Sequence, residues 1–164
     1  MNQYQFRGLQ EADLTEVTAI YNYYVLNSTA TFHAHPLSKE EMRDLVFFDS
    51  PKYKTFAIFE QQSMLGYLII TQHKKREAYD GTAEITIYLK SELTGKGVGS
   101  TAIQFAEEIA KKSGIHVLIA TISGNNNISI RLFEKNGFVK CAHYKEVGKK
   151  FGQWLDVVAY QKII

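Results

Sequence analysis

A glycine-rich turn between an apolar strand and an amphipathic helix most restricts how this chain can fold. Residues 83–89 (A-E-I-T-I-Y-L) combine β-branched and aromatic side chains, which indicates a strand. Glycine then occupies every second position, at Gly95, Gly97 and Gly99, and apolar residues recur at helical spacing from Val98 onward. Glycine lets a ligand approach the backbone closely, and a helix N-terminus presents unpaired N–H groups with partial positive charge. The turn therefore predicts a site for a phosphate or pyrophosphate.

Two common phosphate-binding motifs do not fit this turn. A P-loop places four residues between its glycines and Lys-Ser/Thr directly after the last one, whereas Lys96 lies between glycines here. A dinucleotide fingerprint needs G-x-G-x-x-G and an acidic residue about 20 positions later. The spacing here is G-x-G-x-G, and residues 120–127 contain no acid. Both motifs are excluded.

Hydrophobic periodicity along the rest of the chain predicts an α+β (mixed α/β) fold. We expect a mostly antiparallel sheet flanked by helices, with one parallel right-handed β-α-β crossover across residues 83–122. The apolar run 116–122 predicts a strand buried on both faces. Ser38 and Glu41 form a capping box, and Gly114 ends the glycine-loop helix. The expected order is β-α-α-β-β-β-α-β-α-β-β, with strands near 4–7, 55–59, 64–71, 83–89, 116–122, 138–147 and 153–162, and helices near 14–25, 38–48, 98–113 and 128–136.

Length and composition fit one domain across residues 1–164, because no repeat, low-complexity segment or linker interrupts the chain. A formal net charge of +2 gives no argument for nucleic acid or a membrane as partner. Cys141 is the one cysteine, so no internal disulfide forms, which fits a cytoplasmic protein. We interpret Cys141 as a small core residue. For Lys149 and Lys150 we expect a solvated surface.

A second motif follows the apolar run of residues 116–122. Residues 125–138 read N-N-N-I-S-I-R-L-F-E-K-N-G-F. Asn126 could offer a donor and an acceptor to a ligand amide, and Ser129 could bond the same ligand. The alternative is that Asn126 and Ser129 merely cap the following helix.

Together the two motifs resemble those of the GNAT superfamily of N-acetyltransferases. That family carries Q/R-x-x-G-x-G/A before a long helix, then N-x-x-S-x-x-L-Y/H-x-x-x-G-F, in this order and register. Thr94 stands where Gln or Arg is usual. Phe133 stands where many relatives have the Tyr or His that protonates the leaving thiolate. The thiolate would then leave unprotonated or take a proton from water or another group, with Tyr88 and Tyr144 as possible donors.

Three further stretches, 78–84, 21–32 and 151–156, resemble the phosphinothricin (and methionine sulfoximine) N-acetyltransferase subfamily over nearly the whole chain. The resemblance implies an acetyl-CoA-dependent enzyme that acetylates the α-amino group of a small amino acid or analogue. It also implies direct attack in a ternary complex, a homodimer and no metal. Cys141 is not expected to be a nucleophile, because its strand lies beyond the second motif.

The same resemblance implies roles for individual residues. Glu84 would be the general base, although it could also be a simple charge at a strand edge. Acetyl-CoA would contact Ile87, Tyr88, Leu89, Gly95, Lys96, Gly97, Val98, Gly99, Ser100, Asn126, Ser129 and Phe133. The amine substrate would contact Phe32, Lys74, Arg76, Tyr79, Glu84 and Thr86. A cation at position 74 or 76 would hold a substrate carboxylate or phosphinate, and an exposed basic loop is an equal alternative.

Three other functions stay open at this point. The chain could acetylate a different amine, such as a polyamine, a drug or a peptide N-terminus. It could be a non-catalytic acyl-CoA sensor, which Phe133 leaves possible. It could also bind a nucleoside triphosphate at the glycine turn.

Overall fold

The computed structural model describes residues 4–93 and 95–164 of the chain. The elements follow the predicted order: β1 (Gln5–Gly8), α1 (Leu14–Asn27), α2 (Lys39–Val46), β2 (Lys54–Glu60), β3 (Ser63–Gln72), β4 (Thr82–Leu89), α3 (Val98–Lys112), β5 (Val117–Ser123), α4 (Asn127–Lys135), β6 (Val139–Lys150) and β7 (Gln153–Ile163). Short 3-10 helices lie at Glu11–Asp13 (η1), Glu77–Tyr79 (η2) and Ser91–Leu93 (η3).

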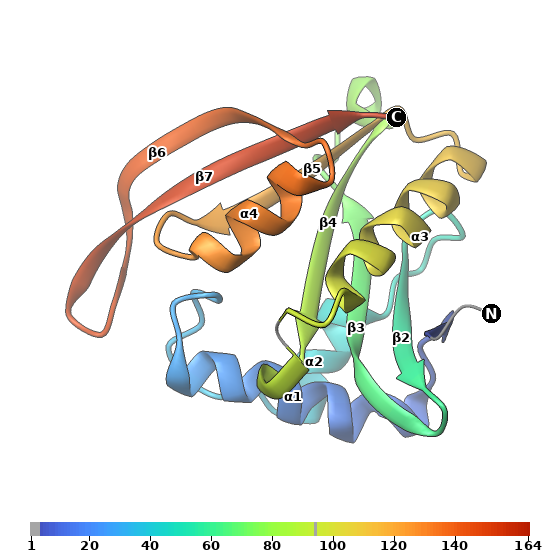
Figure 1. Cartoon of the computed structure of the whole chain (residues 1–164), viewed down its shortest axis with the longest axis horizontal. Helices are drawn as coiled ribbons and strands as arrows, with labels where there is room; N and C mark the ends of the chain where they lie inside the picture. The colour runs from blue at the N-terminus through green and yellow to red at the C-terminus, as the bar shows by residue number, and fades with distance from the viewer. Residues whose placement is uncertain (1–3, 94) are drawn as a thin grey trace.

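One seven-stranded sheet, in the order β1-β2-β3-β4-β5-β7-β6, runs through the described residues. Its neighbouring strands are antiparallel except β4 and β5, which are parallel and connected through α3. This confirms the predicted fold class and crossover. The parallel ladder is short: it joins residues 82–84 to residues 117–119 and ends at Glu84 and Ile119. Beyond that point the two strands separate, while β5 stays paired with β7 (Figure 1).

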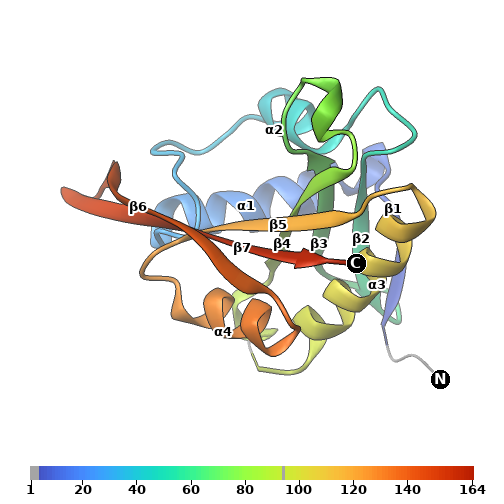
Figure 2. The same ribbon diagram turned by 90° about the horizontal axis from the view of Figure 1, so that it is seen from above.

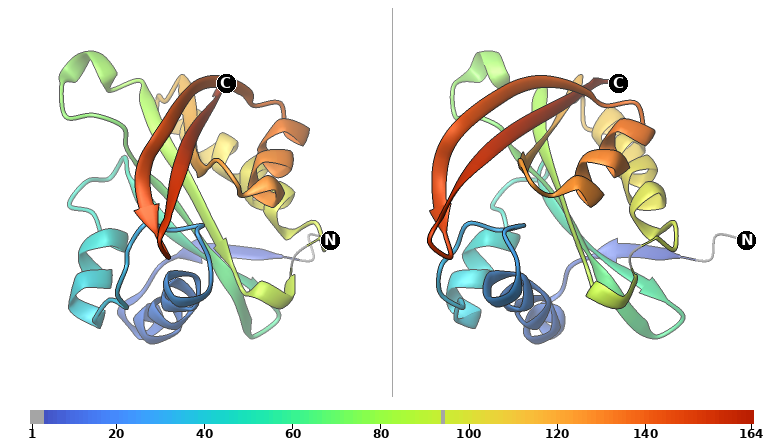
Figure 3. Two further views of the ribbon diagram at one scale, coloured as in Figure 1. Left: turned by 90° about the vertical axis from the view of Figure 1, so that its left-hand side faces the viewer. Right: turned by 60° about the vertical axis from the view of Figure 1, so that its left-hand side comes forward.

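Helices cover both faces of the sheet. Figures 2 and 3 show α1 and α2 on one face and α3 and α4 on the other. Alternation along β4 sends Ile85 into the core beneath α3 and Tyr88 toward the core beneath α1. The two cores therefore fix which face of β4 each functional side chain occupies.

Local sequence explains the ends of the helices. Ser38 Oγ accepts from the Glu41 N–H at 3.2 Å, and Glu41 Oε2 accepts from the Ser38 N–H at 2.8 Å. This confirms the capping box, although α2 ends at Val46, two residues earlier than expected. Gly114 follows the end of α3 with φ of 73°, as the sequence predicted, and Gly97, with φ of 85°, is the N-cap of this helix.

Two expectations for the strands are wrong. Only one face of β5 belongs to a core: Leu118, Ala120 and Ile122 are buried, whereas on the other face Val117 and Ile119 are half-buried and Thr121 is exposed. The reason is that the core beneath α1 and α2 is built on β2 and β3, whereas the core residues of β5 pack beneath α3. Cys141 is exposed rather than in the core, because it lies at a register shift in the edge strand β6.

The close approach of β3 and β4 predicts a sharp difference between two strand glycines. A Cβ at Gly66 would lie 2.2 Å from the Tyr88 carbonyl oxygen and 2.8 Å from the Leu89 Cα, whereas nothing lies within 4 Å of one at Gly8. Overpacking against backbone should make Gly66→Ala lower the free energy of unfolding by at least about 2 kcal/mol. Gly8→Ala should change it by less than about 0.5 kcal/mol. Urea unfolding of both variants checks this, and equal effects would contradict it.

Candidate active site

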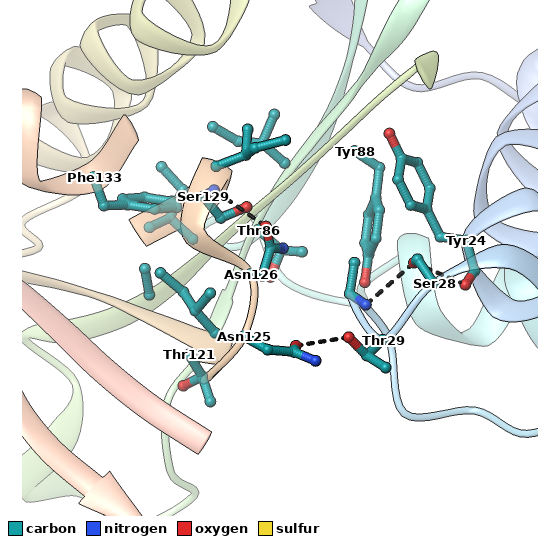
Figure 4. A pocket seen from close by; sticks show the side chains of 16 residues that line it. Tyr24, Ser28, Thr29, Thr86, Tyr88, Thr121, Asn125, Asn126, Ser129 and Phe133 are labelled. Carbon is teal, nitrogen blue, oxygen red and sulfur yellow. Dashed lines mark hydrogen bonds between the residues drawn. The ribbon is translucent and has the colours of Figure 1, made fainter. Parts of the chain in front are cut away.

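A cleft opens where β4 and β5 separate. It consists of a chamber of about 360 Å³ and an adjoining groove of about 460 Å³. Both are lined by Tyr24, Ile87, Ile128, Ser129 and Phe133, so the two spaces are continuous. In Figure 4 the chamber lies between the loop after α1 and the start of α4.

Main-chain groups of β4 face this cleft. The Lys90 N–H donates to the Leu65 carbonyl of β3 at 2.9 Å. Because successive N–H groups of a strand point to opposite edges, those of Ile87 and Leu89 point away from β3, toward the space that β5 leaves. Tyr24 Oη donates to the Leu89 carbonyl at 2.5 Å and so holds α1 against this edge.

The glycine turn forms the far end of the groove. Gly95 and Gly97 have φ of 83° and 85°, and no described atom lies within 4 Å of where their Cβ atoms would be. They therefore shape the turn and leave it open to a ligand. Gly97 is the N-cap of α3, whose first residues Val98, Gly99 and Ser100 line the groove. Lys96 is exposed and is not among the lining residues, and Thr94 lies outside the described residues.

Gly99 is required for a different reason from Gly95 and Gly97. A Cβ there would lie 2.7 Å from Leu132 Cδ2 on α4. Its φ is not positive, so close packing, rather than backbone conformation, requires glycine at this position. The contact joins the two motifs that the sequence showed separately.

Asn126 and Ser129 make the capping contact that the sequence left as an alternative. Asn126 Oδ1 accepts from the Ser129 N–H at 3.2 Å, and both residues also line the chamber (Figure 4). Asn125 was not recognised from the sequence. Its Oδ1 accepts from the hydroxyls of Thr29 at 2.7 Å and Ser123 at 2.9 Å, so it links the two walls of the chamber. No sequence signal identifies it, because Thr29 is 96 positions away.

Glu84 lies at the point where the β4–β5 ladder ends. It is not among the residues that line the chamber, whereas Thr86, on the same face of β4, is. Its carboxylate Oε1 lies 2.9 Å from His73 Nδ1, a contact that the sequence did not indicate. Glu84 thus lies where the two strands begin to separate, two residues before Thr86 on the same face of β4.

The other predicted substrate residues are spread more widely. Lys74 Nζ and Arg76 Cζ lie 5.0 and 5.5 Å from the centre of the Tyr79 ring, and none of the three lines the chamber. Phe32 lines a smaller recess of about 190 Å³, which shares Tyr88 and other residues with the chamber. The structure thus brings Phe32 beside the chamber but places the basic loop outside it.

Lys150 is buried, which corrects the expectation of a solvated side chain. Its Nζ donates to the carbonyls of Ser28 and Thr31, each at 2.8 Å. Burial lowers the pKa of this amine below its ordinary value. The loop after α1 is therefore tied to the tip of the β6–β7 hairpin, beside which it lies in Figure 3. Its neighbour Lys149 is exposed, as expected.

Among residues 4–93 and 95–164 no group of three or more His, Cys, Asp or Glu side chains could hold a metal ion. None of the helices described there has the length and apolar character needed to cross a membrane.

Residues 6–159 match the family model described as acetyltransferase (GNAT) domain. The chain belongs to the GNAT acetyltransferase family. It is 32% identical to a phosphinothricin N-acetyltransferase of Streptomyces coelicolor, over 96% of this chain and 95% of that protein. It is also 32% identical to an L-methionine sulfoximine/L-methionine sulfone acetyltransferase of Pseudomonas aeruginosa, over 92% of this chain and 88% of that protein.

Solved structures agree with this assignment. A GNAT superfamily phosphinothricin acetyltransferase from Sinorhizobium meliloti, in complex with AcCoA, has a TM-score of 0.92 and 30% identity to this chain. The match covers 99% of this chain and 89% of that one. The protein is therefore an acyltransferase with the GNAT fold.

At position 133, where many GNAT relatives have Tyr or His, this chain has Phe. Phe133 is buried at the junction of chamber and groove, with its ring 5.0 Å from that of Phe138. Of the two suggested donors, Tyr144 is exposed on β6 and Tyr88 lines the chamber. Burial raises the pKa of Tyr88, and also that of Tyr24. A thiol has a pKa of about 8.5, below that of a tyrosine hydroxyl, so proton transfer from Tyr88 or Tyr24 to the thiolate would be unfavourable.

Because the amine of Lys150 is buried and that of Lys149 is not, we expect substitution of Lys150 to affect stability and substrate binding far more than substitution of Lys149. Lys150→Met leaves the Ser28 and Thr31 carbonyls without their donor and should lower the free energy of unfolding by about 2 kcal/mol. It should also raise KM for the acceptor amine more than KM for the acyl donor. Lys149→Met, at an exposed position, is the matched control and should do neither.

The pH dependence adds a second readout. Because burial lowers the folded-state pKa of Lys150, the unfolded chain binds more protons, and the Lys150 contribution to stability rises with pH below the ordinary lysine value. Denaturant unfolding across alkaline pH should show this rise in Lys149→Met and not in Lys150→Met. Identical slopes would contradict the assignment.

Proposed function

We propose that the enzyme transfers the acetyl group of acetyl-CoA to the α-amino group of a small amino acid or analogue, by direct attack in a ternary complex. The continuous cleft carries this proposal, since one end is a helix N-terminus open to an anion and the other a chamber lined by hydroxyl and amide groups. The named substrates of the two similar proteins give the acceptor class. The whole chain, residues 1–164, acts as one domain.

The residues present suit the two ends of acetyl-CoA. The N–H groups of Val98, Gly99 and Ser100 would hold the diphosphate at the start of α3. The main chain at Ile87 and Leu89, with Asn126 and Ser129 opposite, would hold the pantetheine arm. Bound there, acetyl-CoA supplies a thioester carbonyl that these N–H groups polarise, as in an oxyanion hole.

Glu84 is the general base of this proposal. Because Glu84 does not itself line the chamber, it would take the ammonium proton through a water molecule. The basic loop with Lys74, Arg76 and Tyr79 follows β3 at the same end of β4 and would attract a substrate carboxylate or phosphinate, while Phe32 bounds the side-chain recess. Most of the acceleration would come from holding the amine against the thioester. The thiolate leaves unprotonated past Phe133, which a pKa near 8.5 permits.

The assembly we propose is a cytoplasmic homodimer. Large apolar side chains are exposed along the β6–β7 hairpin, among them Tyr144, Val147, Phe151 and Trp154. Exposed apolar area of this kind is typical of an interface. The single cysteine fits a reducing compartment.

Thiol release from acetyl-CoA with a panel of amino acids, polyamines and peptides tests the reaction. We expect turnover with small amino acids or their analogues. Glu84→Gln should lower kcat/KM by about 10²-fold or more, the usual loss for a general base, while leaving acetyl-CoA affinity unchanged. Preference for a polyamine or peptide would overturn the acceptor class. Acetyl-CoA binding without turnover on any amine would favour the sensor function that Phe133 leaves open.

Two glycines at opposite ends of α3 test the diphosphate site. Gly97 and Gly114 both have positive φ and open space around the position of Cβ. Alanine should cost each about 1–2 kcal/mol of stability, because positive φ strains a residue with a Cβ. Only Gly97→Ala should weaken acetyl-CoA binding in calorimetry. An equal loss of affinity in Gly114→Ala would place the diphosphate elsewhere. Tight binding of ATP at this site would favour a nucleoside triphosphate as the ligand.

A further inference from the structure

His73 directly follows β3 and contacts the proposed base. Its Nδ1 lies 2.9 Å from Glu84 Oε1, and about one fifth of the His73 side chain (19%) and one third of that of Glu84 (32%) are exposed. Partial burial strengthens a hydrogen bond to a charged group relative to one in open solvent.

The strand register accounts for this contact. Thr71 on β3 is paired with Glu84 on β4, so their side chains share one face of the sheet. His73 lies just past the end of β3, which pairs with β4 as far as Gln72 and Ala83. The β3–β4 ladder thus brings the residue that follows β3 close to Glu84, and the Nδ1–Oε1 contact forms there.

The imidazole packs against an aromatic ring that is itself flanked by two cations. The Tyr79 ring of η2 meets that of His73 edge-on at 5.7 Å. Lys74 and Arg76 in turn lie over Tyr79. These cations lie within cation–π distance of the ring that packs on His73, so the basic loop contributes to the surroundings of this histidine.

We propose that His73 is a positioning residue that, through a hydrogen bond from Nδ1–H to Oε1, orients the Glu84 carboxylate so that its second oxygen faces the chamber. This rests on the proposed function. The Glu84 oxygen that His73 leaves free accepts the proton through a water: the N–H bond of the acceptor ammonium breaks, an O–H bond forms, and the nitrogen keeps the electron pair with which it attacks. Without His73 the carboxylate loses its fixed orientation.

Two substitutions separate the hydrogen bond from the ring. His73→Phe keeps an aromatic ring against Tyr79 and loses the donor. His73→Asn loses the ring and keeps an N–H donor close to the position of Nδ1. We expect His73→Phe to lower kcat by about tenfold, the effect of losing one hydrogen bond to a charged group, with KM for both substrates little changed. His73→Asn should recover most of the loss, whereas a packing role would give the reverse order.

A double-mutant cycle shows whether His73 acts through Glu84. On the Glu84→Gln background, His73→Phe should cause little further loss of kcat. Fully additive losses in the double variant, or an unchanged kcat in His73→Phe, would overturn the inference about His73. The proposed function would still stand in that case, provided that the native chain acetylates an amine. A wild-type chain that binds acetyl-CoA but acetylates no amine overturns both.

Discussion

The early end of the β4–β5 ladder is the constraint on which the rest of this structure depends. Beyond Glu84 and Ile119, β4 stays paired with β3 and β5 stays paired with β7. The facing edges of β4 and β5 therefore separate although each strand keeps one neighbour. Main-chain groups left at such an edge need partners, since an unpaired buried N–H or C=O is costly. Tyr24 Oη supplies one of them to the Leu89 carbonyl, and water or a ligand must supply the others. The cleft is therefore a consequence of strand pairing before it is a property of any side chain.

The chamber of the cleft is assembled from parts far apart in the chain. Lys150, Asn125 and Gly148 each contact the loop after α1: Lys150 and Asn125 by hydrogen bonds, and Gly148 by leaving room for the Phe32 ring. A Cβ at Gly148 would lie 2.3 Å from that ring. The chamber wall is thus fixed by the β6–β7 hairpin. The same hairpin carries the exposed apolar side chains, so the chamber and the proposed dimer surface share one scaffold.

Features set by neighbours in sequence could be predicted, and features set by register could not. The capping box at Ser38, the glycine that follows α3 and the parallel crossover all follow from local patterns. Lys149 and Lys150 look alike in sequence, but alternation along β6 exposes one and buries the other. The His73–Glu84 contact likewise needs the β3–β4 register. The roles of individual site residues in binding and catalysis stay predictions.

In the proposed binding mode, backbone N–H groups hold much of acetyl-CoA, and this has an evolutionary consequence. Recognition by amides of the main chain tolerates replacement of most side chains, because every residue but proline carries the same N–H. Positions such as Gly95 and Gly97 are exceptions, since their left-handed conformation excludes most alternatives. Substitutions along such a groove should therefore be tolerated at most positions, whereas at Gly95 and Gly97 the positive φ itself limits the choice of residue.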